Sequence, residues 1–127
     1  MNLEIFRELE RRVEEFGKVW RDHDADVVRK EFFAPEACVV GEGMPCAARE
    51  ESSVISAIEG MFRAAPLLKV EIVKMRECSS SIIASWLNWH VVNEDGAVLG
   101  TMRSLTVWGR INGSLVILDD SYSAGAI

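Results

Sequence analysis

The stretch from Ile82 to Tyr122, IIASWLNWHVVNEDGAVLGTMRSLTVWGRINGSLVILDDSY, decides the fold. It predicts three long strands joined by two tight turns. Asp95-Gly96 closes the first hairpin, alone or as the end of a loop that starts at Asn93, and Asn112-Gly113 closes the second. These dipeptides tolerate the positive φ angles of hairpin turns and are strong local signals for them. We therefore expect a three-stranded antiparallel meander at the centre of the fold.

Residue parity assigns the side chains of this meander to two faces, because successive side chains on a strand point to opposite sides. With a two-residue turn at Asn112-Gly113, Ile111 pairs with Ser114. Continuing that register pairs Val107 with Leu118, Leu105 with Asp120 and Arg103 with Tyr122, and a β-bulge would break it locally. Neither face alternates cleanly between apolar and polar residues, so both are expected to be covered.

The preceding half of the chain is predicted to be mostly helical, from apolar residues that recur at helical spacing. The expected elements are helices over 3–21, 25–33 and from Ser52 or Ser53 to about Ala65, and strands over 37–40 and 67–78. Asp24 is the expected N-cap of the second helix. Helices followed by a run of strands indicate one α+β domain over residues 1–127, whose curved sheet wraps around the first helix.

Composition narrows the class of protein. The hydrophobic share of 49% and the charged share of 27% are ordinary for a globular domain. No apolar run approaches the roughly 20 residues of a membrane span, and the N-terminus lacks signal-peptide character, so we expect a cytoplasmic protein with no membrane partner. The net charge of −6, without a visible basic face, argues against nucleic-acid binding.

No cofactor or metal site is indicated by the sequence. The three cysteines, Cys38, Cys46 and Cys78, are irregularly spaced and form no C-x-x-C motif, so buried reduced thiols are the simplest interpretation. The two histidines, His23 and His90, lie far apart and lack the carboxylate spacing of a ligand set.

Four segments, in this order, resemble the nuclear-transport-factor-2-like superfamily in its SnoaL-like branch. They span about 110 residues and are WRDHDAD from Trp20, FAPEA from Phe33, RSLTVW from Arg103 and ILDDSYS from Ile117. The resemblance implies a cone-shaped α+β roll with a ligand pocket at its wide end and frequent homodimers through the outer sheet face. The family includes ketosteroid isomerases, polyketide cyclases, dehydratases, epoxide hydrolases and members that only bind or scaffold. The positions of the isomerases' tyrosine and aspartate fall at Gly17 and near Gly41, so that pair is not carried over.

The candidate site gathers polar residues that the predicted register places on one face. The catalytic candidates are His90, Arg103, Asp120 and Tyr122, and the ligand-binding candidates on the same face are Trp86, Asn88, Thr101 and Leu105. Trp20, on the predicted first helix, is a further ligand-binding candidate. Acid-base chemistry by His90 and Asp120 suits enolisation, cyclisation or dehydration of a small apolar or ring-shaped substrate. The competing interpretation of each is structural: Arg103-Asp120 as an ion pair, and His90 as an ordinary strand histidine.

The second face is the predicted interface of a homodimer, because no further segment remains to cover it. Its members are Leu87, Trp89, Met102, Thr106, Trp108 and Ile117. Two functional classes stay open at this point. One is a small-molecule isomerase, cyclase or dehydratase, and the other is a non-catalytic dimeric ligand-binding or accessory domain. They differ in whether His90 and Asp120 open into one ligand-sized cavity.

Overall fold

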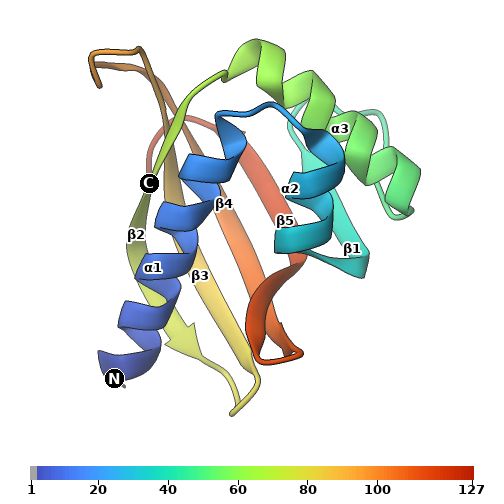
Figure 1. Cartoon of the computed structure of the whole chain (residues 1–127), viewed down its shortest axis with the longest axis vertical. Helices are drawn as coiled ribbons and strands as arrows, with labels where there is room; N and C mark the ends of the chain where they lie inside the picture. The colour runs from blue at the N-terminus through green and yellow to red at the C-terminus, as the bar shows by residue number, and fades with distance from the viewer. Residues whose placement is uncertain (1–2) are drawn as a thin grey trace.

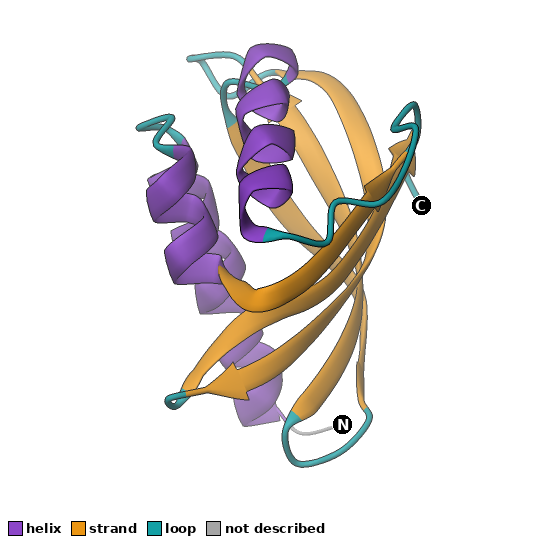
Figure 2. Cartoon of the chain, turned by 90° about the vertical axis from the view of Figure 1, so that its right-hand side faces the viewer, coloured by secondary structure: helices purple, strands orange, loops and turns teal. Residues whose placement is uncertain are grey.

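The computed structural model describes residues 3–127 and has the predicted element order. Its helices are α1 (Leu3–Trp20), α2 (Ala25–Phe32) and α3 (Glu51–Ala64), and its strands are β1 (Phe33–Gly41), β2 (Leu68–Glu77), β3 (Ile82–Val92), β4 (Val98–Ile111) and β5 (Ser114–Ala124). The five strands form one sheet in the order β1-β5-β4-β3-β2, with β1 parallel to β5 and the other pairs antiparallel. The sheet is strongly curved, and all three helices lie on its concave side (Figures 1 and 2). We call this the inner face and the convex side the outer face.

Local sequence explains where the helices begin. Asp24 caps α2 as expected, because its Oδ1 accepts a hydrogen bond from the Val27 N–H at 3.2 Å. The expectation that Ser52 or Ser53 caps α3 is wrong. The N-cap is Glu50, two or three residues earlier, and Ser53, within the first turn, accepts from the Glu50 N–H at 3.0 Å. β1 is longer than predicted and includes Pro35, which an edge strand tolerates because one side of its backbone needs no donor.

Aromatic packing joins α1 to the sheet and to α3. The Phe16 ring lies 5.2 Å from that of Trp89, and the Trp20 ring lies 4.5 Å from that of Phe62. The Trp20 indole N–H also donates to the Ala65 carbonyl at 2.7 Å, which satisfies the polar atom of a buried side chain. The predicted placement of the first helix across a curved sheet is therefore confirmed. No helix within residues 3–127 is long and apolar enough to cross a membrane.

The second hairpin follows the predicted register only near its turn. Ile111 pairs with Ser114 and Trp108 with Ile117, but a bulge at Leu118 then moves β5 along by one residue. The predicted partners of Val107, Leu105 and Arg103 are therefore wrong: these residues face Asp119, Ser121 and Ser123. A one-residue shift carries every later side chain to the other face. Asp120 and Tyr122 thus belong to the inner face.

The predicted dimer interface is also wrong, because its residues lie beneath the protein's own helices. Leu87, Trp108 and Ile117 are fully buried within one chain, Trp89 is 6% exposed, and Met102 packs against the same core. The helices cover this face because it is apolar along much of its length, whereas the other face alternates with polar residues. The outer face is the one left open.

Candidate functional site

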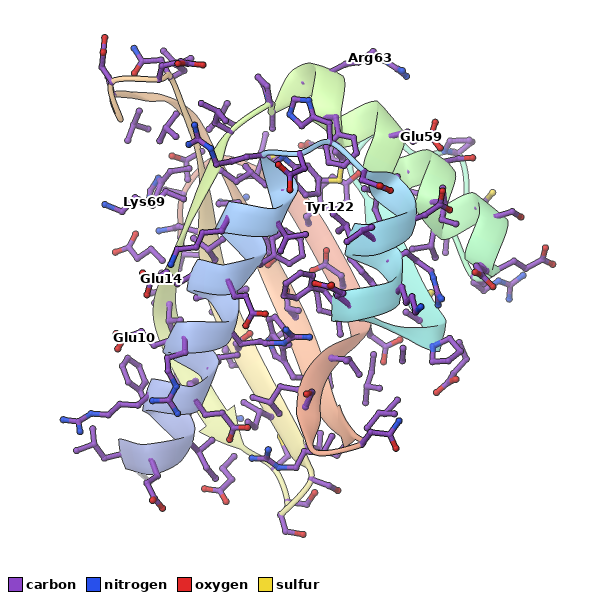
Figure 3. The ribbon with its side chains drawn as sticks, viewed as in Figure 1. Glu10, Glu14, Glu59, Arg63, Lys69 and Tyr122 are labelled. Carbon is purple, nitrogen blue, oxygen red and sulfur yellow. The ribbon has the colours of Figure 1, made fainter. Side chains whose placement is uncertain are left out.

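A small pocket lies on the inner face, enclosed by the sheet, α1, α3 and β1. Its volume of about 30 Å³ has room for roughly two water-sized atoms. Its walls are almost entirely apolar, and among the described residues that line it Asp120 is the only carboxylate. The lining consists of Phe16, Trp20, Phe33, Val39, Val54, Ala57, Ile58, Met61, Leu68, Trp89, Met102, Asp120 and Tyr122. Figure 3 shows Tyr122 on this helix-covered side of the sheet.

A chain of hydrogen bonds runs through the core to Asp120. Trp89 Nε1 lies 2.6 Å from Ser104 Oγ, Ser104 Oγ lies 2.8 Å from Thr106 Oγ1, and Thr106 Oγ1 donates to Asp120 Oδ1 at 2.6 Å. An indole N–H can only donate, and Thr106 uses its single proton on Asp120, so Ser104 donates to Thr106. All three donors therefore point toward the carboxylate, and Asp120 Oδ1 is committed to this chain.

The surroundings of Asp120 raise the pKa of its carboxyl group toward neutral pH. Burial raises its pKa to about 6 from 3.8, against the opposing effect of the Thr106 hydrogen bond. No described residue donates to the second oxygen, Oδ2. No buried polar side-chain atom within residues 3–127 lacks a partner, so Oδ2 keeps accessible surface. This oxygen is the one that a proton or a ligand can reach.

Tyr122, two residues along β5, shares the pocket with Asp120. Burial, and then the charge of Asp120, raise the pKa of its phenol, so the hydroxyl stays protonated at neutral pH. Its proton goes to Met44 Sδ at 3.5 Å, a weak acceptor that a carbonyl oxygen could replace. A carboxylate with a pKa near 6 and a neutral hydroxyl donor thus lie side by side in an apolar pocket.

Gly41 makes the position of the Tyr122 ring possible. The two residues pair between β1 and β5, and a Cβ atom at Gly41 would lie 2.0 Å from the ring Cζ. Any larger residue would displace the ring. A glycine within a strand often marks such a close approach, which is the signal that the sequence offers for this residue.

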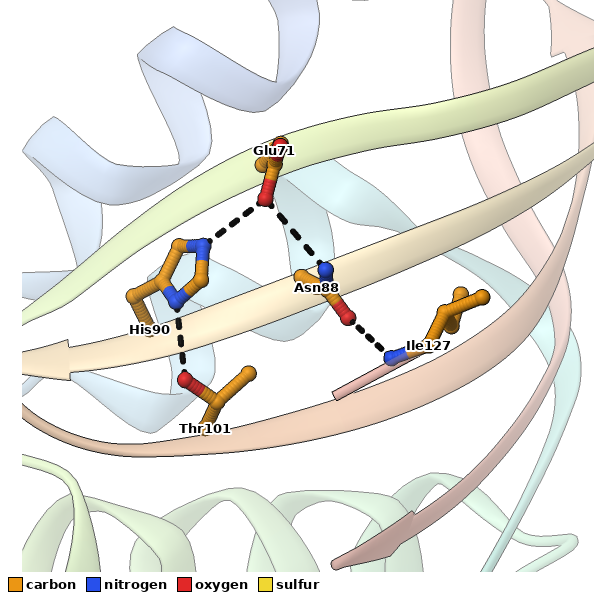
Figure 4. Close-up of polar contacts among 5 residues, drawn as sticks. All are labelled: Glu71, Asn88, His90, Thr101 and Ile127. Carbon is orange, nitrogen blue, oxygen red and sulfur yellow. Dashed lines mark hydrogen bonds and ion pairs between the residues drawn. The ribbon is translucent and has the colours of Figure 1, made fainter. Parts of the chain in front are cut away.

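The other predicted site residues come together on the outer face, away from the pocket. His90 is held by Thr101 Oγ1 on Nδ1 at 2.8 Å and by Glu71 Oε1 on Nε2 at 2.9 Å (Figure 4). Asn88 donates to the same Glu71 oxygen at 3.3 Å and accepts from the Ile127 N–H at 2.9 Å. The hydrogen bond from His90, and next that from Asn88, lower the pKa of Glu71. The cluster links β2, β3 and β4 to residue 127.

Arg103 and Trp86 also lie on the outer face. Arg103 Nε donates to Ser123 Oγ at 3.0 Å and its Nη1 donates to the Ala126 carbonyl at 3.3 Å, so the expected Arg103-Asp120 pair does not form. Trp86 has Lys74 and Arg76 over its ring, at 5.6 and 5.8 Å from the centroid. The predicted constellation is therefore divided: the pocket holds Asp120, Tyr122 and Trp20, and the outer face holds His90, Arg103, Trp86, Asn88, Thr101 and Leu105.

Comparison with known proteins identifies the fold. No family model and no curated protein matches the sequence. A ketosteroid isomerase-like protein from Erwinia carotovora has a TM-score of 0.75 at 16% identity, with 100% of both chains covered. The protein Aln2 from a Streptomyces species has 0.74 at 15%, covering 98% of this chain and 93% of that one. An NTF2-like protein of unknown function from Pseudomonas putida has 0.73 at 15%, covering 98% and 89%. The chain has the NTF2-like, cystatin-like fold that the resemblance implies.

Proposed function

We propose that this NTF2-like domain binds a small apolar carbonyl compound in the inner pocket and that Asp120 moves a proton on it. The observation that carries the proposal is a single carboxyl group, with its pKa raised to about 6, at the wall of an otherwise apolar pocket. A general base works best with a pKa close to the working pH. The reaction class is isomerisation, cyclisation or dehydration through an enolate.

The geometry suggests a role for each group. Asp120 Oδ2, the oxygen not held by Thr106, takes a proton from the carbon next to the substrate carbonyl. The electron pair of the broken C–H bond moves into an enolate, whose oxygen accepts a hydrogen bond from the Tyr122 hydroxyl. In an isomerisation Asp120 then returns the proton to another carbon. In a cyclisation the enolate carbon attacks a second carbonyl carbon of the substrate, whose C=O π bond opens and whose oxygen takes the proton from Asp120. In a dehydration the enolate expels a β-hydroxyl group, which leaves as water with that proton. The Trp89-Ser104-Thr106 chain holds the other carboxylate oxygen in place throughout.

A ring-shaped ligand needs more room than about 30 Å³, and two methionines can supply it. Met61 on α3 and Met102 on β4 both line the pocket. Methionine is unbranched and adapts its shape more readily than other core residues. We therefore expect the ligand to displace these two side chains rather than the aromatic wall.

Proton exchange in D₂O tests the proposal without knowledge of the natural substrate. A panel of small cyclic ketones is incubated with the protein, and deuterium at the carbon next to the carbonyl is followed by NMR. We expect catalysed exchange with the wild type and its loss in Asp120→Asn. Asp119→Asn is the matched control, because Asp119 is exposed on the opposite face. Equal exchange by the wild type and Asp120→Asn would refute the role of Asp120.

The small cavity favours a second candidate function, that of a non-catalytic ligand-binding domain. The same panel separates the two. Ketones that raise the melting temperature but exchange no protons would support binding alone.

We further propose a homodimer through the outer face. Leu105 and Val40 are each 41% exposed there, and Leu105 pairs with Trp86. Lys74 and Arg76 flank this apolar patch on one side and Asp119 on the other, so a two-fold axis would bring opposite charges together. Sedimentation equilibrium at micromolar concentration measures the mass directly, and a stable monomer would exclude it.

A further inference from the structure

A groove of about 620 Å³ runs between α1 and β2, separate from the wall that carries Asp120. Figure 3 shows Glu10, Glu14 and Lys69 along this side of the molecule. Phe6 and Val13 of α1 and Val70 and Ile72 of β2 provide its apolar walls. Neither the pocket chemistry nor the outer-face patch makes use of this groove.

The groove exposes the free backbone edge of the sheet. β2 is the last strand in the sheet order. The Leu67 carbonyl accepts from the Val92 N–H at 3.1 Å, and the antiparallel ladder alternates from there. The backbone groups of Leu68, Val70 and Ile72 therefore point away from β3, and no residue of 3–127 outside the sheet hydrogen-bonds to them.

α1 covers this edge at one end only. A Cβ atom at Gly17 would lie 3.0 Å from the Leu68 carbonyl oxygen, so helix and strand are in contact there because residue 17 is glycine. Further along β2 the groove separates the helix from the strand edge. The N–H and C=O groups of Val70 and Ile72 are consequently reachable from the groove.

We propose that the α1–β2 groove binds an extended peptide segment of a partner protein, which pairs antiparallel with β2 as a sixth strand. The free N–H and C=O groups of β2 repeat every second residue, which is the spacing at which an extended peptide backbone presents its own donors and acceptors. The flanking apolar walls would receive alternate side chains of the peptide. Antiparallel pairing is chosen because it is the more stable of the two.

The charges in the groove fix the polarity of the peptide. Lys18, Arg21 and Lys69 lie at the Leu68 end, whereas Glu10 and Glu14 lie toward Ile72; Lys18 and Glu14 are 3.9 Å apart where the two groups meet. Glu71 is already held by His90 and Asn88 on the outer face. Glu10 and Arg21 are about 16 Å apart along the helix axis, the length of about five strand residues. An antiparallel peptide therefore needs a basic residue at its N-terminal end and an acidic residue at its C-terminal end.

The probe is the peptide acetyl-Lys-Thr-Val-Thr-Val-Thr-Glu-amide, added to the whole protein, because its two charged residues and its valines point to the same side of an extended strand. We expect amide exchange at Val70 and Ile72, measured by NMR, to slow by about tenfold or more at saturation. Two further versions carry N-methyl groups on the valine amides or on the threonine amides. Only one set faces β2, so one version should lose binding and the other should retain it. Loss in both, or in neither, would overturn the strand-pairing geometry.

Charge reversal supplies the matched variants. The double change Glu10→Lys and Glu14→Lys should lower the affinity for this peptide by about tenfold and raise the affinity for a peptide with Lys and Glu exchanged. Glu59→Lys, on the exposed surface of α3, is the control and should change neither affinity (Figure 3). Protection that maps outside residues 68–72, or binding that ignores these charges, would overturn the proposal.

Discussion

Removing the charge of Asp120 should make the protein more stable at neutral pH. The pKa of this carboxyl is about 6 in the folded protein, against 3.8 for an ordinary aspartate, a difference of about 2.2 units. At about 1.36 kcal/mol per unit, the ionised carboxylate lowers the free energy of unfolding by at most about 3 kcal/mol. Asparagine keeps an oxygen that can accept from Thr106 but carries no charge.

The sign and the pH window follow from proton binding. Between pH 3.8 and about 6 the folded state binds the Asp120 proton more tightly than the unfolded state does. The contribution of Asp120 to the free energy of unfolding of the wild type therefore falls as the pH rises through this window. Above about pH 6 this contribution no longer changes with pH. Asp120→Asn lacks that loss, so its advantage should be near zero at pH 4 and largest at pH 8.

Urea unfolding at pH 4, 6 and 8 measures the effect, with Asp119→Asn as the control. Asp119 is exposed on the outer face, so its substitution should change the free energy of unfolding by less than about 0.5 kcal/mol at each pH. A stability difference between Asp120→Asn and the wild type that does not grow with pH would refute the assignment of Asp120 as a desolvated group. A gain of this size would agree with the proposed function, because functional sites often trade stability for activity.

Three further predictions concern the pocket and the outer face. Thr106→Val removes a donor to the carboxylate worth about 1.5–3 kcal/mol, so the pKa of Asp120, followed by ¹³C NMR, should rise by about one to two units; no rise would show that the hydrogen-bond chain does not act on the carboxyl. Gly41→Ala should lower the free energy of unfolding by about 1–3 kcal/mol and shift the ring resonances of Tyr122, the chain's single tyrosine, whereas unchanged resonances would contradict the close contact. Leu105→Glu should convert the proposed dimer to monomers in sedimentation, and an unaltered dimer would place the interface elsewhere.

The element order could be predicted from the sequence because its signals are local. Asn112-Gly113 sets the turn, and the pairs nearest to it follow directly. Amphipathic spacing placed α1, and Asp24 marked the start of α2. These features depend on neighbouring residues alone, so tertiary packing does not alter them.

The division of the candidate site could not be predicted, because it depends on one extra residue in β5. No glycine or asparagine marks the bulge at Leu118, and Asp119 and Asp120 are both aspartates, so either could have pointed inward. The relation between β3 and β4 was predicted correctly, since Asn88 pairs with Arg103 and His90 with Thr101. The candidate residues of β3 and β4 therefore share the outer face as predicted, whereas Asp120 of β5 lies on the inner face.

Two hydrogen-bond chains on the inner face, one from Trp108 and one from Trp89, end on different kinds of acceptor. Each of two core tryptophans needs an acceptor for its indole N–H. Trp108 donates to Ser85 Oγ at 2.9 Å, and the Ser85 hydroxyl donates to the Thr106 carbonyl at 3.0 Å, so this chain ends on a backbone acceptor. The chain from Trp89 ends on Asp120, whose other oxygen is accessible. Satisfying a tryptophan therefore does not require a carboxylate. The cost of keeping Asp120 in an apolar wall therefore has no structural purpose, and this is the physical argument behind the proposed function of Asp120.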